Sequence, residues 1–194
     1  MTNIILMDEP TPPPFEEFPK IARLNRLCIA TEKLDGANVG ITIADDFQTI
    51  WVNSRTKWIT LEDDYKGFAR WVHEHKEQLL RLGPGTHRGE WWGSGLGRGY
   101  GLKEKRFSLF NTHRWGDPAA RPDCCGVVPV LAQGMDIRAV TEEALAILRK
   151  EGSRAAPGFM RPEGVVIYHT AADVMFKVTL ENDGVPKSQV QEAS

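Results

Sequence analysis

The pairing of short β-rich segments is the sequence feature that most constrains the fold of this chain. Residues 38–43 and 49–53 are rich in β-branched and aromatic residues, and the polar stretch between them is typical of a β-hairpin turn. Because few helical patterns separate the β-rich segments, the sequence predicts an α+β fold with antiparallel sheets and flanking helices. Further strands are expected at 107–110, 126–132, 164–168 and 173–178.

Two helices are predicted from apolar residues at helical spacing. The first is expected over residues 61–82, with Thr60 as its capping residue, and a Gly-Pro-Gly sequence ends the pattern. The second is expected over residues 142–151, with Thr141 at its start and Gly152 at its end.

Length and composition indicate one ordinary globular domain. The chain has 194 residues, of which 41% are hydrophobic and 26% are charged, so we expect a single domain over 1–194 with a frayed tail from about 182. Residues 8–14 form a proline-rich lead-in. The net charge of −2 excludes a global basic field, so any nucleic-acid surface must be local.

Cysteine usage and hydropathy indicate the compartment. Cys28, Cys124 and Cys125 have no regular spacing, which argues for a reducing environment rather than a disulfide framework. The N-terminal residues lack the pattern of a signal peptide, and no apolar run has the length of a membrane span. We therefore expect a monomeric cytoplasmic protein that does not bind membranes.

A lysine between two carboxylates carries the strongest chemical signal. Glu32, Lys33 and Asp35 precede Gly36, at the junction between an apolar segment and the β-rich residues 38–43. Lysine is a poor nucleophile while protonated, and a nearby metal cation or partial burial favours the neutral amine. A surface hairpin with mixed charges is the alternative, because Asp-Gly is also a common turn sequence.

The segment Lys33-Leu34-Asp35-Gly36 resembles the Lys-x-Asp-Gly signature of the covalent nucleotidyltransferases, which include DNA ligases, RNA ligases and mRNA capping enzymes. Other short motifs similar to those of the superfamily follow in the same order. The resemblance implies that Arg55 binds the nucleotide, Glu90 holds the ribose hydroxyls, Phe110 stacks on adenine, Glu163 and Asp35 hold a metal ion, and Lys177 contacts the ATP phosphates. It also implies a place for Glu32 in the nucleotide site.

The best match within the superfamily is the phage-type RNA ligases that seal nicks. The resemblance rests on the sequence Gly36-Ala37-Asn38, in which Asn38 would help to position strand ends, and on residues 18–21, which resemble the opening strand of that group. Two departures stand out: Thr179 occupies the place of a second lysine, so one phosphate contact is either missing or supplied by another residue such as Lys187, and Asn111 occupies the place of an aspartate.

The implied reaction uses ATP with Mg²⁺ or Mn²⁺ and has three steps. Lys33 takes AMP from ATP, the AMP passes to a 5′-phosphate, and a 3′-hydroxyl attacks that activated end. Asp35, Glu163 and Lys177 are the other catalytic residues that the resemblance implies. The expected substrate is RNA, with DNA as the alternative.

A glycine-rich segment, 89–101, is a candidate nucleic-acid surface. It contains Arg98 and is followed by Lys103, so phosphate contacts are expected here. A flexible turn followed by a solvated charge run is the alternative. The segment is not a P-loop, because the Gly-x-x-x-x-Gly-Lys pattern is absent.

Two further functions share these residues. One is the adenylation domain of a DNA ligase, because short motifs do not distinguish the 2′-hydroxyl. The other is a non-catalytic nucleotide- or RNA-binding protein on a ligase fold. Larger relatives carry an additional C-terminal domain that grips nucleic acid, so a helper protein is an expected partner.

Overall fold

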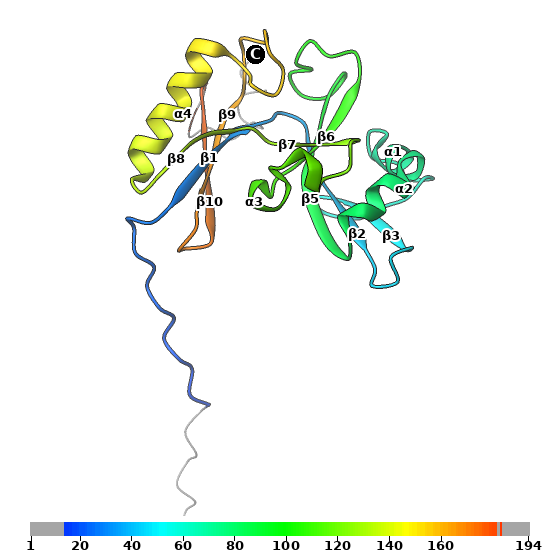
Figure 1. Cartoon of the computed structure of the whole chain (residues 1–194), viewed down its shortest axis with the longest axis horizontal. Helices are drawn as coiled ribbons and strands as arrows, with labels where there is room; N and C mark the ends of the chain where they lie inside the picture. Colours follow the sequence, from blue (N-terminus) through cyan, green and yellow to red (C-terminus); the bar gives the residue numbers. More distant parts are fainter. Residues whose placement is uncertain (1–13, 182, 184–194) are drawn as a thin grey trace, which may run out of the picture.

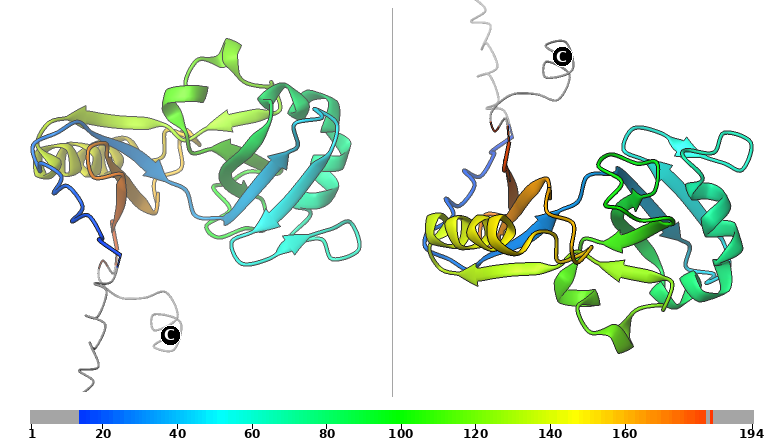
Figure 2. Two further views of the ribbon diagram at one scale, coloured as in Figure 1. Left: turned by 90° about the horizontal axis from the view of Figure 1, so that it is seen from below. Right: turned by 90° about the horizontal axis from the view of Figure 1, so that it is seen from above.

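The computed structural model describes residues 14–181 and residue 183. The predicted proline-rich lead-in falls almost wholly outside these residues, as do Lys187 and nearly all of the expected tail. The described residues form two β-sheets that lie side by side, each with helices on one face (Figures 1 and 2). The predicted α+β class with antiparallel sheets and flanking helices is confirmed.

The first sheet, called sheet A here, has four antiparallel strands and one long helix. The helix α4 (Ile137–Glu151) packs on one face and buries an apolar cluster that includes Ala30, Leu148 and Val165. We call this the helix face of sheet A and the opposite one its cleft face. In spatial order the strands are β10 (Val174–Thr179), β9 (Gly164–His169), β1 (Cys28–Lys33) and β8 (Val130–Gly134).

The second sheet, sheet B, is larger. Its helices α1 (Phe68–Glu74) and α2 (Lys76–Leu79) cover a core that includes Ile41, Phe68 and Phe107. The face opposite these helices is the cleft face of sheet B. In spatial order the strands are β4 (Trp58–Ile59), β3 (Ile50–Ser54), β2 (Ala37–Ile43), β5 (Gly85–Gly93), β6 (Lys105–Leu109) and β7 (Cys125–Val127).

The predicted helix over 61–82 is wrong at its start. Lys66 and Gly67 have φ values of 58° and 83°, which break helical geometry, so α1 begins only at Phe68. The Thr60 hydroxyl does accept a hydrogen bond from the Asp63 N–H, but the bond closes a local turn and no helix follows it. The rest of the segment is α1, α2 and the 3₁₀ turn Leu80–Leu82.

The second predicted helix is present but longer. Asp136 caps α4, since its side chain accepts hydrogen bonds from the N–H groups of Arg138 and Ala139. Thr141 lies inside the helix, where its hydroxyl donates to the carbonyl of Ile137. Gly152 ends the helix, as expected, with a φ of 77°.

Two strand predictions are corrected. The segment 126–132 is divided between β7 in sheet B and β8 in sheet A, because Pro129 lacks the N–H that a continuous strand would need. Residues 18–21, expected as an opening strand, form no strand, and Phe18 and Ile21 are highly exposed. Two short elements, α3 (Thr112–Trp115) and the 3₁₀ turn Pro118–Ala120, lie between β6 and β7. No helix among the described residues is long and apolar enough to cross a membrane.

Candidate active site

The lysine motif lies where the chain crosses from one sheet to the other. Residues 34–36 join β1 in sheet A to β2 in sheet B, and residues 128–129 join β7 back to β8. Leu34 and Val128, one from each crossing, are buried in one apolar cluster. Lys33, at the end of β1, is therefore fixed beside the junction of the two sheets.

Lys33 forms an ion pair with Glu163. Its Nζ lies 2.6 Å from Oε2 of Glu163, and the two side chains are 22% and 2% exposed. The pairing of β1 with β9 sets this contact, because Lys33 is opposite Gly164, the residue that follows Glu163. The two residues that the sequence places 130 positions apart thus meet directly.

Glu90 contributes a partly buried carboxyl from sheet B. It lies opposite Asn38 on β2, and its Oε1 accepts a hydrogen bond of 3.0 Å from the Gly36 N–H. Burial raises the pKa of Glu90 to about 7; the charge of Lys33 and the Gly36 bond oppose the shift, while Glu163 and Asp35 add to it. These mutual electrostatic effects show that the residues of the two sheets share one site.

Residues of the glycine-rich segment 89–101 contact Asp35 and hold it in place. Its backbone N–H donates to the hydroxyl of Tyr100 at 2.8 Å, and its carboxylate lies 3.7 Å from Nε of Arg98. Gly97 is needed for this approach, because a Cβ there would lie 2.3 Å from the Asp35 carbonyl oxygen. Arg98 also donates to the carbonyl of Arg161 and forms an ion pair with Glu181, so the guanidinium predicted to contact phosphate already has three protein partners.

Glu32 points away from Lys33. It is 1% exposed, and its Oε2 accepts hydrogen bonds from the N–H groups of Arg154 and Ala155 at 2.8 and 3.0 Å. Burial raises the pKa of the Glu32 carboxyl, against the lowering effect of its hydrogen bonds, including one with Ser153. The structure therefore separates Glu32 from the other residues predicted to bind the nucleotide and gives it contacts with the loop after α4.

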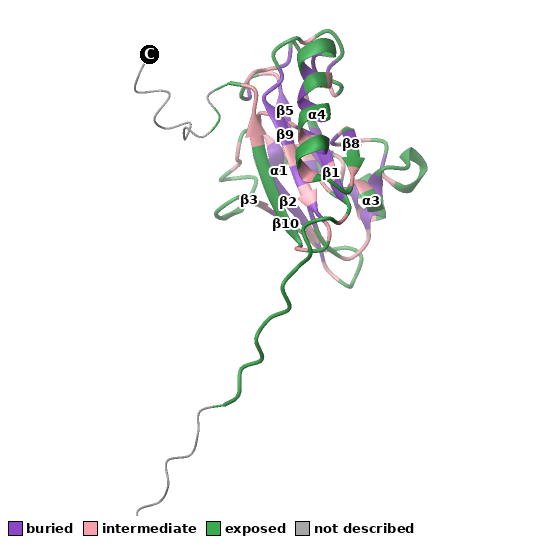
Figure 3. Cartoon of the chain, turned by 90° about the vertical axis from the view of Figure 1, so that its left-hand side faces the viewer, coloured by how far each residue is buried: buried purple, intermediate pink, exposed green. Residues whose placement is uncertain are grey.

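Lys177 lies on the cleft face of sheet A. It is opposite Val166, which is opposite Thr31, so strand alternation puts Lys177 on the same face as Lys33. Figure 3 shows that β10 is largely exposed. Thr179, in the place of a second lysine, directs its N–H and hydroxyl to Asp183.

Sheet B and the residues next to it carry the other residues predicted to bind the nucleotide or nucleic acid. Asn38 is half-buried beside Glu90, and Phe110 is half-buried against the cluster that contains Leu34. Arg55 directly follows β3 and is exposed, as is Lys103. The structure does not bring Lys103 into the ion pairs around Lys33, among the described residues.

The carboxylates suit a hydrated divalent cation. Among the described residues no group of three or more metal-ligating side chains is close enough to hold a metal ion alone. Mg²⁺, however, is usually bound by one or two carboxylates together with waters and substrate phosphates. Asp35 and Glu163, both near Glu90, offer oxygen ligands of this kind.

The sequence did not predict the roles of Tyr100 and Gly97. Both act on Asp35 across about sixty positions, and only the alternation of glycines with large side chains in 89–101 signalled a special backbone there. Asn111, where the resemblance expected an aspartate, caps α3 by accepting from the Arg114 N–H.

Solved structures with the same fold include RNA ligases of Naegleria gruberi. A variant of Naegleria gruberi RNA ligase determined with ATP and Mn has a TM-score of 0.58 and 20% identity, covering 87% of this chain and 52% of that one. The Naegleria gruberi RNA ligase with PPi gives a TM-score of 0.55, 20% identity and the same coverage. This chain thus spans about half the length of these ligases. No curated protein matches by sequence.

A protein-family comparison gives the more specific result. The family described as RNA ligase matches residues 26–179, which include all the strands of both sheets and every site residue described above. The chain belongs to the RNA ligase family.

Proposed function

We propose that this protein is an ATP-dependent RNA ligase that works through a lysyl-AMP intermediate on Lys33. The observation that carries the proposal is the contact between Lys33 and buried Glu163 at the sheet junction, with Glu90 facing them from sheet B. Related RNA ligase structures were determined with ATP and Mn or with PPi, and ATP is the substrate and PPi a product of such a step; another was determined with AMP and Mn. The RNA ligase family match favours RNA over DNA as the substrate.

The first step forms one bond and breaks another at the α-phosphorus of ATP. Nζ of Lys33 attacks the phosphorus, the N–P bond forms, and the bond to the bridging oxygen breaks to release pyrophosphate. The Nζ must first lose a proton, and Glu163 is the group that accepts a hydrogen bond from it at 2.6 Å. A divalent cation at Asp35 and Glu163 would neutralise phosphate charge and favour the neutral amine.

The remaining residues hold the nucleotide in line. Glu90 accepts hydrogen bonds from the ribose hydroxyls, and Phe110 stacks on adenine. Arg55 and Lys177 bind the phosphates, where fixed positive charge stabilises the transition state. Asn38 positions the strand ends, and Arg98 keeps Asp35 in place.

In the two later steps, the AMP passes to the 5′-phosphate of an RNA strand and a 3′-hydroxyl displaces it. Lys103 is an exposed candidate for the RNA backbone. The proposal includes a single adenylation domain that acts as a cytoplasmic monomer, with a helper protein as a possible additional grip on the RNA. We propose nick sealing of the phage type as the mode of joining.

Covalent labelling tests the proposal. Purified protein, first freed of bound AMP by pyrophosphate, is incubated with ATP labelled at the α-phosphate and Mg²⁺, and denatured. We expect a labelled band that Lys33→Ala lacks and that GTP does not produce, while the exposed-residue control Lys103→Ala keeps it. If wild-type protein takes no label and intact mass shows no AMP, a non-catalytic binding protein becomes the better hypothesis.

Substrate choice is tested on the labelled protein. Nicked RNA duplexes and nicked DNA duplexes of the same sequence are offered to it, and sealed strands are measured. Sealing of DNA alone would replace RNA ligation by the DNA ligase alternative.

A further inference from the structure

Two tryptophans on sheet B are exposed to an unusual degree. The side chains of Trp51 on β3 and Trp58 on β4 are 49% and 62% exposed, whereas Trp91 and Trp92 are almost fully buried. Exposed aromatic residues that gather on one surface commonly mark a binding site. Their placement therefore needs a reason other than packing.

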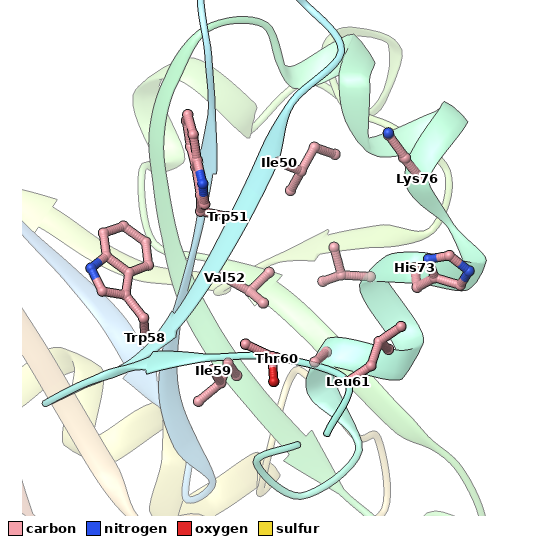
Figure 4. Close-up of a pocket in the computed structure, with 11 residues that line it drawn as sticks. Ile50, Trp51, Val52, Trp58, Ile59, Thr60, Leu61, His73 and Lys76 are labelled. Carbon is pink, nitrogen blue, oxygen red and sulfur yellow. The ribbon is translucent and has the colours of Figure 1, made fainter. Parts of the chain in front are cut away.

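Both tryptophans project from the cleft face of sheet B. Asn53 is opposite Trp58 on one side and Gly40 on the other, and Trp51 is opposite Thr42. Figure 4 shows the two tryptophan rings on one side of β3 and β4, with Val52 on the other side. Trp51 and Trp58 are thus diagonal neighbours on one face, at a Cα separation of about 7–8 Å.

This exposed surface is continuous with the candidate active site. Along β5, Thr86, Arg88 and Glu90 share one face, and they are opposite Thr42, Gly40 and Asn38 of β2. The line of paired residues that ends at Trp58 therefore lies two residues along the strands from the line that contains Glu90, and the line that contains Trp51 lies four residues away. Measured along the strands, these offsets are about 7 and 14 Å.

The surface between the tryptophans and β5 is flat and polar. Gly40 has no side chain, and the Asn53 carboxamide lies over it, 2.6 Å from where a Cβ would be. Thr42 and Thr86 hydroxyls are 3.0 Å apart. Arg88 is exposed, and no ion pair within the described part of the chain engages it. Flat aromatic rings beside an unpaired guanidinium suit a nucleotide, whose base stacks and whose phosphate is anionic.

We propose that Trp51, Trp58, Asn53 and Arg88, which we call the tryptophan platform, bind an unpaired RNA segment that adjoins the duplex whose nick lies at Lys33. The proposal rests on the proposed ligase function and adds to it the part of the surface that holds the substrate. Bases stack on the two indoles with little regard to sequence, and Arg88 contacts a phosphate. The anionic RNA backbone matches the charge of Arg88, bases match the two exposed indoles, and the chain belongs to the RNA ligase family, so RNA is the better occupant.

The test measures RNA binding directly. A fluorescein-labelled, 5′-phosphorylated single-stranded RNA is titrated with wild-type protein, a Trp51→Ala/Trp58→Ala double variant, and a Trp51→Phe/Trp58→Phe double variant, with anisotropy as the readout. Leu61→Ala is the matched control, since Leu61 is also an exposed apolar residue at the sheet edge but lies off the cleft face, on the side of His73. Circular dichroism confirms that each variant is folded.

We expect the alanine double variant to bind RNA about 10- to 100-fold more weakly, with much of the affinity kept in the phenylalanine variant and all of it in Leu61→Ala. Arg88→Ala should weaken binding and reduce its salt dependence, because a phosphate contact is lost. Unchanged RNA binding in the alanine variant would overturn the proposal, and a change of its oligomeric state in light scattering would assign the tryptophans to contact between copies instead. Failure of the proposed function appears separately, as absence of AMP transfer to wild-type protein without RNA.

Discussion

The two faces of sheet A carry charged residues in opposite surroundings, exposed on one face and buried on the other. On the cleft face, Lys33 is partly exposed and Lys177 is exposed. On the helix face, Glu32 is buried and its hydrogen bonds go to the backbone after α4. Glu32 and Lys33 are adjacent in the chain, so the alternation of the strand puts the proposed nucleophile and a buried carboxyl on opposite faces of the sheet.

The largest effect is expected on the cleft face. Lys177→Ala should slow lysyl-AMP formation by about 10²- to 10³-fold, because a fixed positive charge at the phosphates is lost. The free energy of unfolding should change by less than about 0.5 kcal/mol, since Lys177 is exposed. Single-turnover labelling with ATP measures the rate, and Lys150→Ala, at an exposed position of α4, is the control. An equal loss in the control would break the comparison between faces.

On the helix face, the change should appear in stability. Glu32→Ala leaves two buried N–H groups without an acceptor and should lower the free energy of unfolding by about 2–4 kcal/mol. Glu32→Gln keeps an acceptor without a buried charge and should be at least as stable as wild type at pH 7. Urea unfolding measures both, with exposed Glu151→Ala as the control. If Glu32→Gln abolished AMP transfer while remaining folded, Glu32 would belong to the nucleotide site after all.

Glu90 extends the comparison to sheet B, because it is partly buried and also faces the cleft. Its pKa of about 7 lies above the ordinary value of 4.5, so the folded state holds the proton more tightly than the unfolded state does. This contribution to stability is complete below pH 4.5 and is lost as the pH rises through 7. Relative to Glu90→Gln, wild type should lose about 1–3 kcal/mol between pH 4 and pH 8. If the urea midpoints of wild type and Glu90→Gln differed by the same amount at both pH values, the raised pKa of Glu90 would be contradicted.

The smallest effect is expected at the hydroxyl that holds Asp35. Tyr100→Phe removes the acceptor for the Asp35 N–H and should cost about 1–2 kcal/mol of unfolding free energy. Tyr168→Phe is the matched control, because that hydroxyl is bonded to Asp173 at the surface and should matter little. A loss in Tyr168→Phe as large as in Tyr100→Phe would remove the special role of the sheet junction.

Local patterns in the sequence predicted the elements whose causes are local. The hairpin of β2 and β3 follows from alternating β-branched residues, and the end of α4 follows from Gly152. The predicted start of the first helix was wrong because Lys66 has a positive φ, which nothing in its side chain requires. The predicted continuous strand over 126–132 was wrong because Pro129 interrupts it, and no local pattern shows that the two halves belong to different sheets.

The site residues divide in the same way. Lys33, Asp35, Glu90 and Glu163 stand in short motifs that can be recognised one at a time, and the structure brings them together. The orientation of Glu32 depends on which face of β1 meets α4, and that is a tertiary property. The support of Asp35 by Gly97 and Tyr100 depends on a fold that joins distant segments, so no local pattern contains it.

The double crossing between the sheets has a thermodynamic consequence. Lys33 and Glu163 belong to sheet A and Glu90 to sheet B, so a nucleotide held by all three bridges two bodies that only residues 34–36 and 128–129 connect covalently. Any rotation of one sheet against the other would alter its binding free energy. By linkage, the bound nucleotide must in turn favour the angle between the sheets at which it binds most tightly. The difference in its affinity between two angles sets the size of that preference. Lys33, the proposed nucleophile, directly precedes residues 34–36, so substitutions in the lysine motif would change both the proposed chemistry and one of the two connections between the sheets.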